Sequence, residues 1–251
     1  MKYKYDTHIH SLEGSACAIS SVREMVHAYH EAGYTGFILT DHFIHGNTAV
    51  PRNLSWKERM KMYYDIYLNA KEEGDKLDFD VLFGVEHWYE KAREILTYGI
   101  DLNFLLSHPE LRTANIDTYA KLVHKAGGIL VHAHPYRQRD YIPAGFQARI
   151  DLCDGIEVYN AHDPWEHNKL ALKDAIALNK LPFSGGDMHY CADRTIGNAG
   201  ILLDKRVQSM AEFLELVKVK EYSVLIDGKE YSAGSISENF LSRSHMQTNL
   251  K

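Results

Sequence analysis

The chain has 251 residues, of which 25% are charged and 45% hydrophobic, and its 28 Lys and Arg against 34 Asp and Glu leave a formal charge of −6. These proportions are those of globular proteins and exclude the disordered and fibrous classes. The acidic balance argues against binding of nucleic acid over a broad basic face, and the length suffices for a large core without disulfides.

Short apolar runs alternate with longer amphipathic ones along the chain. The runs that we predict to be strands are residues 3–8, 36–40, 81–85, 104–107, 129–131, 155–159, 183–186 and 201–203. Amphipathic segments lie between most of them, and a serine followed three residues later by a glutamate marks helix starts at Ser21 and Ser55. Alternation of strands and helices at this spacing predicts an α/β fold with a parallel sheet.

The chain shows no long linker, low-complexity segment or internal repeat. We therefore expect a single domain over residues 1–230. Residues 231–251 are polar and rich in serine, and we expect them to form a loosely attached C-terminal tail.

Polar residues recur at the C-terminal end of one predicted strand after another. They are His8 and His10, Asp41 and His42, Glu86 and His87, His108, His132 and His134, Asn160, and Asp187 and His189. In a closed parallel barrel these ends converge on one face, where active sites form. The ends of the predicted strands would thus place many of the chain's 15 histidines on one face of the barrel.

The spacing of these side chains predicts a metal site. Residues two apart on a strand point to the same face, so His8 and His10 can grip one cation, as can Asp187 and His189. Glu86 carries two oxygens and can bridge two cations. Clustering imidazoles and carboxylates without a cation would leave polar groups unpaired at a heavy desolvation cost. Mixed ligands of this kind suit zinc, manganese or iron, and ligand type alone does not choose among them.

The motifs DTHIH, TDH, GVE, SHP, HAHP and GGDMH occur in this order between about Asp6 and Gly200. In this respect the chain resembles the PHP family (polymerase and histidinol phosphatase) of metal-dependent phosphoesterases. The resemblance implies a distorted (β/α)7 TIM-like barrel. It also implies a site for two to three divalent cations at which phosphoesters are hydrolysed.

The resemblance further implies roles for individual residues. The matching motifs assign His8, His10 and Asp187 to the first metal, Glu86 as a bridge to the second, His108 and His134 to the second, and His42 and His189 to the third. The family often supplies a further His or Asp after the H-x-H pair, where this chain reads SLEGSACAIS. Glu13, the carboxylate in that stretch, is the candidate ligand, and without it the third site would be weak or empty. His132 is an alternative to His134, which we prefer because it precedes Pro135.

Other residues are expected to act beside the metals. Clustered cations lower the pKa of bound water, so the expected nucleophile is a metal-activated hydroxide. Asp41 is expected to orient a ligating imidazole or to carry a proton. Arg137 and Arg194 are candidates to clamp the phosphate, because guanidinium forks match its geometry. Trp88, close to Glu86, is a candidate to line the substrate pocket.

These residues predict a metal-dependent phosphoric ester hydrolase. The charge of −6 and the absence of Lys/Arg runs favour a small phosphomonoester as substrate. Histidinol phosphatase activity is one specific alternative, and phosphodiesterase or exonuclease activity on nucleic acid is another that is not favoured. An amidohydrolase-type metal enzyme also opens with H-x-H, but the additional ligands here suit a third metal. An inactive metal-binding module is the non-enzyme alternative. The presence of both Glu86 and Asp187 argues against it, because loss of activity would usually begin with loss of such a carboxylate.

The first residues of the chain and its cysteines indicate in which cellular compartment the protein is expected. MKYKYDTHIH lacks the apolar run of a signal peptide, and no stretch approaches the ~20 apolar residues of a membrane span. Cys17, Cys153 and Cys191 are odd in number and widely spaced, which favours free thiols. We interpret Cys17 and Cys191, which flank metal motifs, as packed thiols rather than ligands. We expect a cytoplasmic protein without membrane contact, and the sequence does not indicate its oligomeric state.

Overall fold

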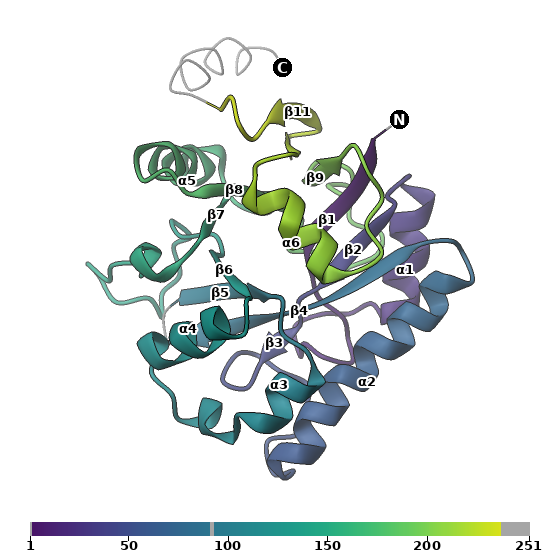
Figure 1. The fold of residues 1–251 in the computed structure, drawn as a ribbon, viewed down its shortest axis with the longest axis vertical. Helices are drawn as coiled ribbons and strands as arrows, with labels where there is room; N and C mark the ends of the chain where they lie inside the picture. The colour runs from purple at the N-terminus through teal and green to yellow at the C-terminus, as the bar shows by residue number, and fades with distance from the viewer. Residues whose placement is uncertain (1, 91–92, 237–251) are drawn as a thin grey trace.

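The computed structural model describes residues 2–90 and 93–236 (Figure 1). A sheet runs through the molecule with the strand order β11-β10-β9-β1-β2-β4-β5-β6-β7-β8, and β3 pairs with β4 beside this path. The strands are β1 (Tyr3–Ile9), β2 (Gly36–Leu39), β3 (His42–Phe43), β4 (Asp80–Tyr89), β5 (Arg93–Tyr98), β6 (Ile129–His132), β7 (Gly155–Asn160), β8 (Leu181–Gly185), β9 (Gly200–Leu203), β10 (Ser223–Ile226) and β11 (Lys229–Ser232). The helices are α1 (Val22–Glu31), α2 (Trp56–Asp75), α3 (Leu102–Ser107), α4 (Ile116–Lys125), α5 (Trp165–Ala177) and α6 (Met210–Lys218), with short 3-10 helices at Pro109–Arg112 and Ile150–Leu152.

The sheet curls so that β8 comes to lie against β1. β1 pairs in parallel with β2 and β2 with β4, while β6, β7 and β8 form a second parallel group. The hydroxyl of Thr7 donates a hydrogen bond to the carbonyl of Ser184 over 2.9 Å, and Met188, just beyond β8, pairs in parallel with Ile9. The carboxyl ends of the parallel strands therefore face one another across a half-barrel, and the residues that follow them are brought together.

The predicted α/β class is confirmed, whereas the distorted (β/α)7 TIM-like barrel stays a prediction. The mixed sheet is interrupted by β5, which is antiparallel to both of its neighbours, β4 and β6. β9 is likewise antiparallel to β1 and to β10. Because antiparallel neighbours need no crossover helix, β5 follows β4 with no helix between them, and the strict alternation of strand and helix is lost there.

The predicted strand at residues 104–107 is wrong. This segment lies in α3, which begins after Asp101, whose side chain accepts a hydrogen bond from the backbone N–H of Phe104 over 2.8 Å. A short apolar run does not distinguish a buried strand from a buried helix, and here the helix cap and the burial of Phe104 and Leu105 decide. β5, for which the sequence predicted no strand, takes the place between β4 and β6.

Helices α1 and α2 lie side by side along one flank of the sheet (Figure 1). Both begin at the predicted capping boxes, in which Ser21 and Ser55 accept hydrogen bonds from the backbone three residues on. Their buried faces meet the sheet in an aromatic core, where Tyr29 and Phe79 each pack edge-on against Phe37. This packing anchors β1, β2 and β4 and so fixes the strand ends that carry polar residues.

The C-terminal part of the described chain adds a hairpin to the sheet. β11 pairs with β10 in antiparallel register, with Ile226 opposite Lys229 and Val224 opposite Tyr231. The predicted start of the tail at residue 231 therefore falls inside this hairpin, and residues 237–251 of the predicted tail lie outside the described residues. Within residues 2–90 and 93–236, no helix is both long and apolar enough to cross a membrane.

Candidate metal centre

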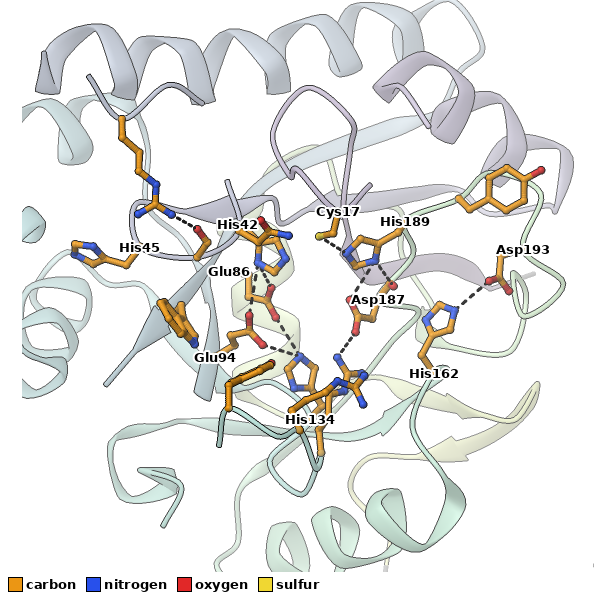
Figure 2. Close-up of a pocket in the computed structure, with 18 residues that line it drawn as sticks. Cys17, His42, His45, Glu86, Glu94, His134, His162, Asp187, His189 and Asp193 are labelled. Carbon is orange, nitrogen blue, oxygen red and sulfur yellow. Dashed lines mark hydrogen bonds and ion pairs between the residues drawn. The ribbon is translucent and has the colours of Figure 1, made fainter. Parts of the chain in front are cut away.

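Histidines and carboxylates from many elements meet at the mouth of the half-barrel (Figure 2). Among the described residues, sets of three place their ligand atoms within 4.8 Å of one another: His8, His10 and Asp187; His8, His134 and Glu157; His42, Glu86 and Glu94; and His10, His42 and His189. Because these sets share members, they form one continuous group, which we call the histidine–carboxylate cluster.

His8 and His10 are carried by β1 and its end and are completely buried. Their Nε2 atoms lie 3.0 Å apart, and Asp187 Oδ1 lies 3.6 Å from the first and 3.3 Å from the second. The Nδ1 atom of His8 contacts Glu157 Oε1 at 2.8 Å, and that of His10 contacts the Ser15 hydroxyl at 2.9 Å. Partners of this kind on Nδ1 orient a metal-ligating imidazole and leave Nε2 as the donor.

Glu86 stands at the centre of the cluster and reaches imidazoles on several sides. Its Oε1 atom lies 3.2 Å from Nε2 of both His8 and His134, and its Oε2 atom lies 2.8 Å from Nδ1 of His42. Neither Glu86 Oε2 nor His42 Nδ1 makes a hydrogen bond to the described residues, although both are buried. A buried carboxylate oxygen and a buried imidazole nitrogen with so few other partners can share a cation, so these residues fit divalent metal ions.

Burial and neighbouring charges set the protonation of these groups. Burial, reinforced by nearby imidazoles, holds the pKa of His10 well below its ordinary value, so that His10 is a neutral donor. Burial alone would raise the pKa of Glu86, but the His8 imidazole and its neighbours hold it well below the ordinary range. The Arg137 guanidinium likewise overcomes burial and holds the pKa of Asp187 well below its ordinary value. Ionised carboxylates beside a neutral imidazole are a donor set for a divalent cation.

Backbone strain coincides with the cluster. His134 and Asp187 both adopt left-handed backbone conformations, with φ of 27° and 53°. Such conformations in residues other than glycine cost of order 1–3 kcal/mol each and persist where the surroundings impose them, often at functional sites. Both residues follow parallel strands, β6 and β8, so the strained turn redirects each side chain back toward the cluster.

A cavity of about 930 Å³ lies over the cluster. Cluster residues form part of its lining, and Figure 2 shows their side chains pointing into the same space. The rest of the lining includes the aromatic side chains of Trp88, Tyr141 and Tyr190, so the structure places Trp88 where the sequence predicted it. Arg52 and Arg139 bring cationic groups to the same wall.

Neither a protein-family model nor a curated protein matches the chain. Solved structures do resemble it. One is a two-domain protein from Bacteroides vulgatus that contains a predicted PHP-like metal-dependent phosphoesterase, with a TM-score of 0.64 at 14% identity over 92% of this chain and 66% of that one. Another is the lesion-specific endonuclease PfuEndoQ from Pyrococcus furiosus, with a TM-score of 0.61 at 12% identity over 97% of this chain and 66% of that one. A third is an amidohydrolase from Chromobacterium violaceum, with a TM-score of 0.56 at 15% identity over 88% of this chain and 97% of that one.

This chain shares its fold with these structures, one of which contains a predicted PHP-like phosphoesterase. The resemblance that the motifs indicated is thereby confirmed at the level of the fold, which is what identities of this size show. The chain spans just under two thirds of the length of the first two relatives.

His108 does not join the cluster, contrary to its predicted role at the second metal. It caps the end of α3, where its ring packs on Phe104 and its Nδ1 atom contacts Glu110 at 2.8 Å. The wrong strand at residues 104–107 explains the difference, because a helix end does not project its side chain into the mouth of the sheet. Glu94, which the sequence did not indicate, lies there instead, 3.5 Å from His134 Nε2.

Glu94 was missed because of the direction of its strand. β5 runs antiparallel to β4, with Glu94 opposite Trp88, so the start of β5 lies beside the end of β4. A search for polar residues at carboxyl ends of strands does not detect a ligand at an amino end. His132, the alternative to His134, lies elsewhere, with its Nε2 atom 2.8 Å from the Tyr89 hydroxyl.

Glu13 also lies outside the cluster. Its Oε2 atom accepts a hydrogen bond from the backbone N–H of Val22, at the start of α1, over 3.0 Å. Cys17, from the same stretch of chain, lines the cavity instead, with Sγ 3.1 Å from His189 Nε2 (Figure 2). Burial opposes ionisation of the Cys17 thiol, but His189 and His42 outweigh it and lower the pKa of Cys17 to about 6.

The three residues expected beside the metals have different surroundings. Asp41 accepts a hydrogen bond from the Ser15 hydroxyl over 2.8 Å, and Ser15 in turn contacts His10, so Asp41 orients His10 through Ser15. Burial raises the pKa of Asp41 to about 6. Arg137 lines the cavity, whereas Arg194 is exposed and is not among the described residues that line it.

Arg137 is held firmly by the protein itself. Its guanidinium donates to Asp163 Oδ1 over 2.6 Å, to Asp187 Oδ2 over 2.7 Å and to Asn160 Oδ1 over 2.9 Å. These bonds direct the remaining Asp187 oxygen toward the histidines. The guanidinium has five N–H groups, so donors remain for a ligand in the cavity.

Proposed function

We propose that this protein is a metal-dependent phosphoester hydrolase that acts on a small phosphomonoester. The observation that carries the proposal is the continuous histidine–carboxylate cluster at the floor of a cavity whose wall holds arginine and aromatic side chains. The cavity volume of about 930 Å³ lies within the range of roughly 300–1,000 Å³ typical of small-molecule sites.

Two to three divalent cations are proposed as cofactors, with zinc, manganese or iron as candidates. His8, His10 and Asp187 would hold one cation, with Glu86 as the bridge to a second. Glu86, Glu94 and His134 would hold that second cation, with His42 at its edge. When bound, such cations supply Lewis acidity and a nucleophile at neutral pH.

The chain's own residues prepare this chemistry. Glu157 and Ser15 turn the Nε2 atoms of His8 and His10 toward the cavity floor. Arg137 holds Asp187 in place and has N–H groups left for a phosphoryl oxygen. Arg52 and Arg139, at the exposed rim, would draw an anionic substrate into the cavity.

Arginine and aromatic groups together favour a phosphate attached to an organic group over inorganic phosphate. Guanidinium groups recognise the phosphate, while Trp88, Tyr141 and Tyr190 offer apolar faces to the rest of the substrate. Nucleic acid remains the alternative substrate class, because one relative of this fold is a lesion-specific endonuclease.

The test is phosphate release from a panel of phosphomonoesters and phosphodiesters, histidinol phosphate among them, with Mn²⁺ or Zn²⁺ supplied. We expect release from monoesters, reduced by at least about 10²-fold in Asp187→Asn. Asp75→Asn, at an exposed carboxylate near the end of α2 that pairs with Lys71, serves as the matched control and should retain activity.

Other outcomes would redirect the proposal. Activity confined to diesters or DNA ends would contradict the monoester and favour a nuclease. Hydrolysis of cyclic amides in place of phosphoesters would favour an amidohydrolase. Metal-loaded protein that is silent across the whole panel would refute phosphoester hydrolysis.

A further inference from the structure

Cys17 lies where imidazoles of the cluster reach the cavity wall. Its Sγ atom is 3.1 Å from His189 Nε2, and its thiol also contacts the His42 ring. Figure 2 shows Cys17 and His189 facing each other across the cavity edge. His42 and His189 belong, with His10, to a set whose ligand atoms lie within 4.8 Å of one another. The thiol is therefore next to a group of metal-ligating side chains rather than isolated.

The hydrogen bonds of His189 leave the nitrogen that faces Cys17 free to bind. Its Nδ1 atom lies 2.9 Å from the backbone carbonyl of Asp187, which can only accept, so Nδ1 carries the proton. Nε2 then carries the lone pair, and it is this atom that meets the sulfur. An imidazole bound to a backbone carbonyl through one nitrogen and donating with the other is the usual state of a metal-ligating histidine.

The neighbouring His42 contacts both Glu86 and Cys17. It is 7% exposed, its Nδ1 atom lies 2.8 Å from Glu86 Oε2, and its ring also contacts the Cys17 thiol. His10, by contrast, directs its Nε2 atom to His8 and Asp187, and so belongs to the adjacent set. Cys17 and His189, together with His42, which also contacts Glu86, thus form a group of donors on the open side of the cluster.

The position of Cys17 is determined by hydrogen bonds on both sides of it. The backbone N–H of Ala16 donates to the carbonyl of Asn47 over 2.7 Å. The N–H of Ile19 donates to the carbonyl of His189 over 2.9 Å, which ties the loop directly to the histidine. Glu13 cannot take this place, because it caps the start of α1.

We propose that Cys17, His42 and His189 form a sulfur-containing site for a thiophilic divalent cation of the zinc class. Two imidazoles and one thiolate, with a fourth position open to the cavity, match the ligand count of catalytic zinc sites. Sulfur favours zinc or cobalt over manganese and magnesium, so this site differs in metal preference from the oxygen-rich sites beside it. The inference rests on metal binding by the cluster and not on the proposed phosphatase activity.

The test adds Co²⁺ to metal-free protein and records the near-ultraviolet absorption spectrum. A sulfur-to-cobalt charge-transfer band is expected in the wild type and in Cys191→Ser, and its absence is expected in Cys17→Ser. With Zn²⁺, X-ray absorption should show a sulfur neighbour at about 2.3 Å that Cys17→Ser lacks. Zinc affinity of this site should fall by more than about 10-fold in Cys17→Ser, since loss of an outer partner alone costs 10–100-fold.

Cys17→Asp separates the chemistry of sulfur from the presence of a ligand. This variant should keep the metal stoichiometry of the wild type, lose the charge-transfer band and shift in preference from Zn²⁺ toward Mn²⁺. Circular dichroism confirms that each variant is folded. Cobalt-loaded wild type without a sulfur band, or a band that survives in Cys17→Ser, would overturn the inference. A sulfur band in protein that releases no phosphate would refute the proposed function and leave the inference standing.

Discussion

The candidate metal centre has two halves that are built differently. In the first half, His8 and Glu86 are carried by strands and Asp187 directly follows one, and all three are almost completely buried. In the second half, Cys17 and His189 lie in loops. The side chain of His189 is 28% exposed, against none for His8.

The difference shows what each kind of support permits. Neighbouring strands hold their side chains in fixed register, so a ligand there has little freedom to change. Loops carry function with more tolerance to change. A cysteine can therefore occupy the loop position where the PHP pattern often has His or Asp, while the strand positions keep the expected residues.

The largest expected effect is a loss of stability when Arg137 is replaced. Arg137 holds Asp187, which belongs to the first half of the centre. In Arg137→Ala the buried carboxylates of Asp187 and Asp163 lose their partner. We expect the free energy of unfolding of metal-free protein to fall by about 3–5 kcal/mol, measured by urea denaturation. The exposed Arg194→Ala should stay within about 0.5 kcal/mol of the wild type. Equal effects of the two variants would contradict the assigned role.

The next effect concerns the bridging carboxylate. Glu86→Gln keeps the shape of the side chain but removes the negative charge that four imidazole contacts share. We expect phosphate release to fall by about 10²–10³-fold and bound metal per chain to decrease, measured by elemental analysis. Full metal content with unchanged turnover would show that Glu86 does not bridge.

The pH dependence of stability tests the strand next to the bridge. His87 follows Glu86 on β4 but points to the opposite face, where its ring stacks on Tyr119 at 4.0 Å. Burial lowers the pKa of His87 from 6.5 to about 3. Between these values the unfolded chain binds more protons, so the stability that neutral His87 confers is complete above pH 6.5 and lost as the pH falls toward 3.

His87→Phe keeps the stacked ring and removes this titration. Between pH 6.5 and 4.5, wild-type protein should lose about 2 kcal/mol more stability than the variant. Urea denaturation of metal-free protein at the two pH values measures the difference. Parallel losses in both proteins would mean that His87 is already protonated in the fold.

The smallest effect distinguishes the two candidates for the second metal. Glu94→Gln should weaken metal binding by about 10-fold or more, because an anionic oxygen beside His134 is lost. His108→Ala should leave metal affinity unchanged, since His108 contacts Glu110 and Phe104 instead. Isothermal titration of metal-free protein with Zn²⁺ compares them. The reverse order would restore His108 as a ligand.

The sequence could predict the histidines and the aspartate that lie on or just after parallel strands, including His189. The H-x-H pair and the D-M-H pair follow apolar runs, and both runs are strands in the structure. A period of two then places His8 and His10 on one face without further information. The capping boxes at Ser21 and Ser55 were equally local, and both are present.

The sequence could not predict the helix at residues 102–107, the place of Glu94 in the cluster or the place of Cys17 beside His189. LNFLLS is as apolar as a buried strand, and only the hydrogen bond from Phe104 to the side chain of Asp101 and the packing around it make it a helix. Glu94 precedes an apolar run rather than following one, and its relevance depends on β5 running antiparallel to β4. Neither the strand direction nor the choice between Glu13 and Cys17 is contained in a local pattern.

The sequence by itself determined the α/β class, the order of the metal motifs and the side chains that each parallel strand end presents, because these follow from short-range periodicity and apolar burial. Only the tertiary structure decided which strand lies between β4 and β6. This strand brings Glu94, rather than His108, into the histidine–carboxylate cluster. The tertiary structure also decided that Cys17 rather than Glu13 meets His189. These outcomes depend on contacts between segments far apart in the chain, where packing and hydrogen bonding choose among locally equivalent alternatives.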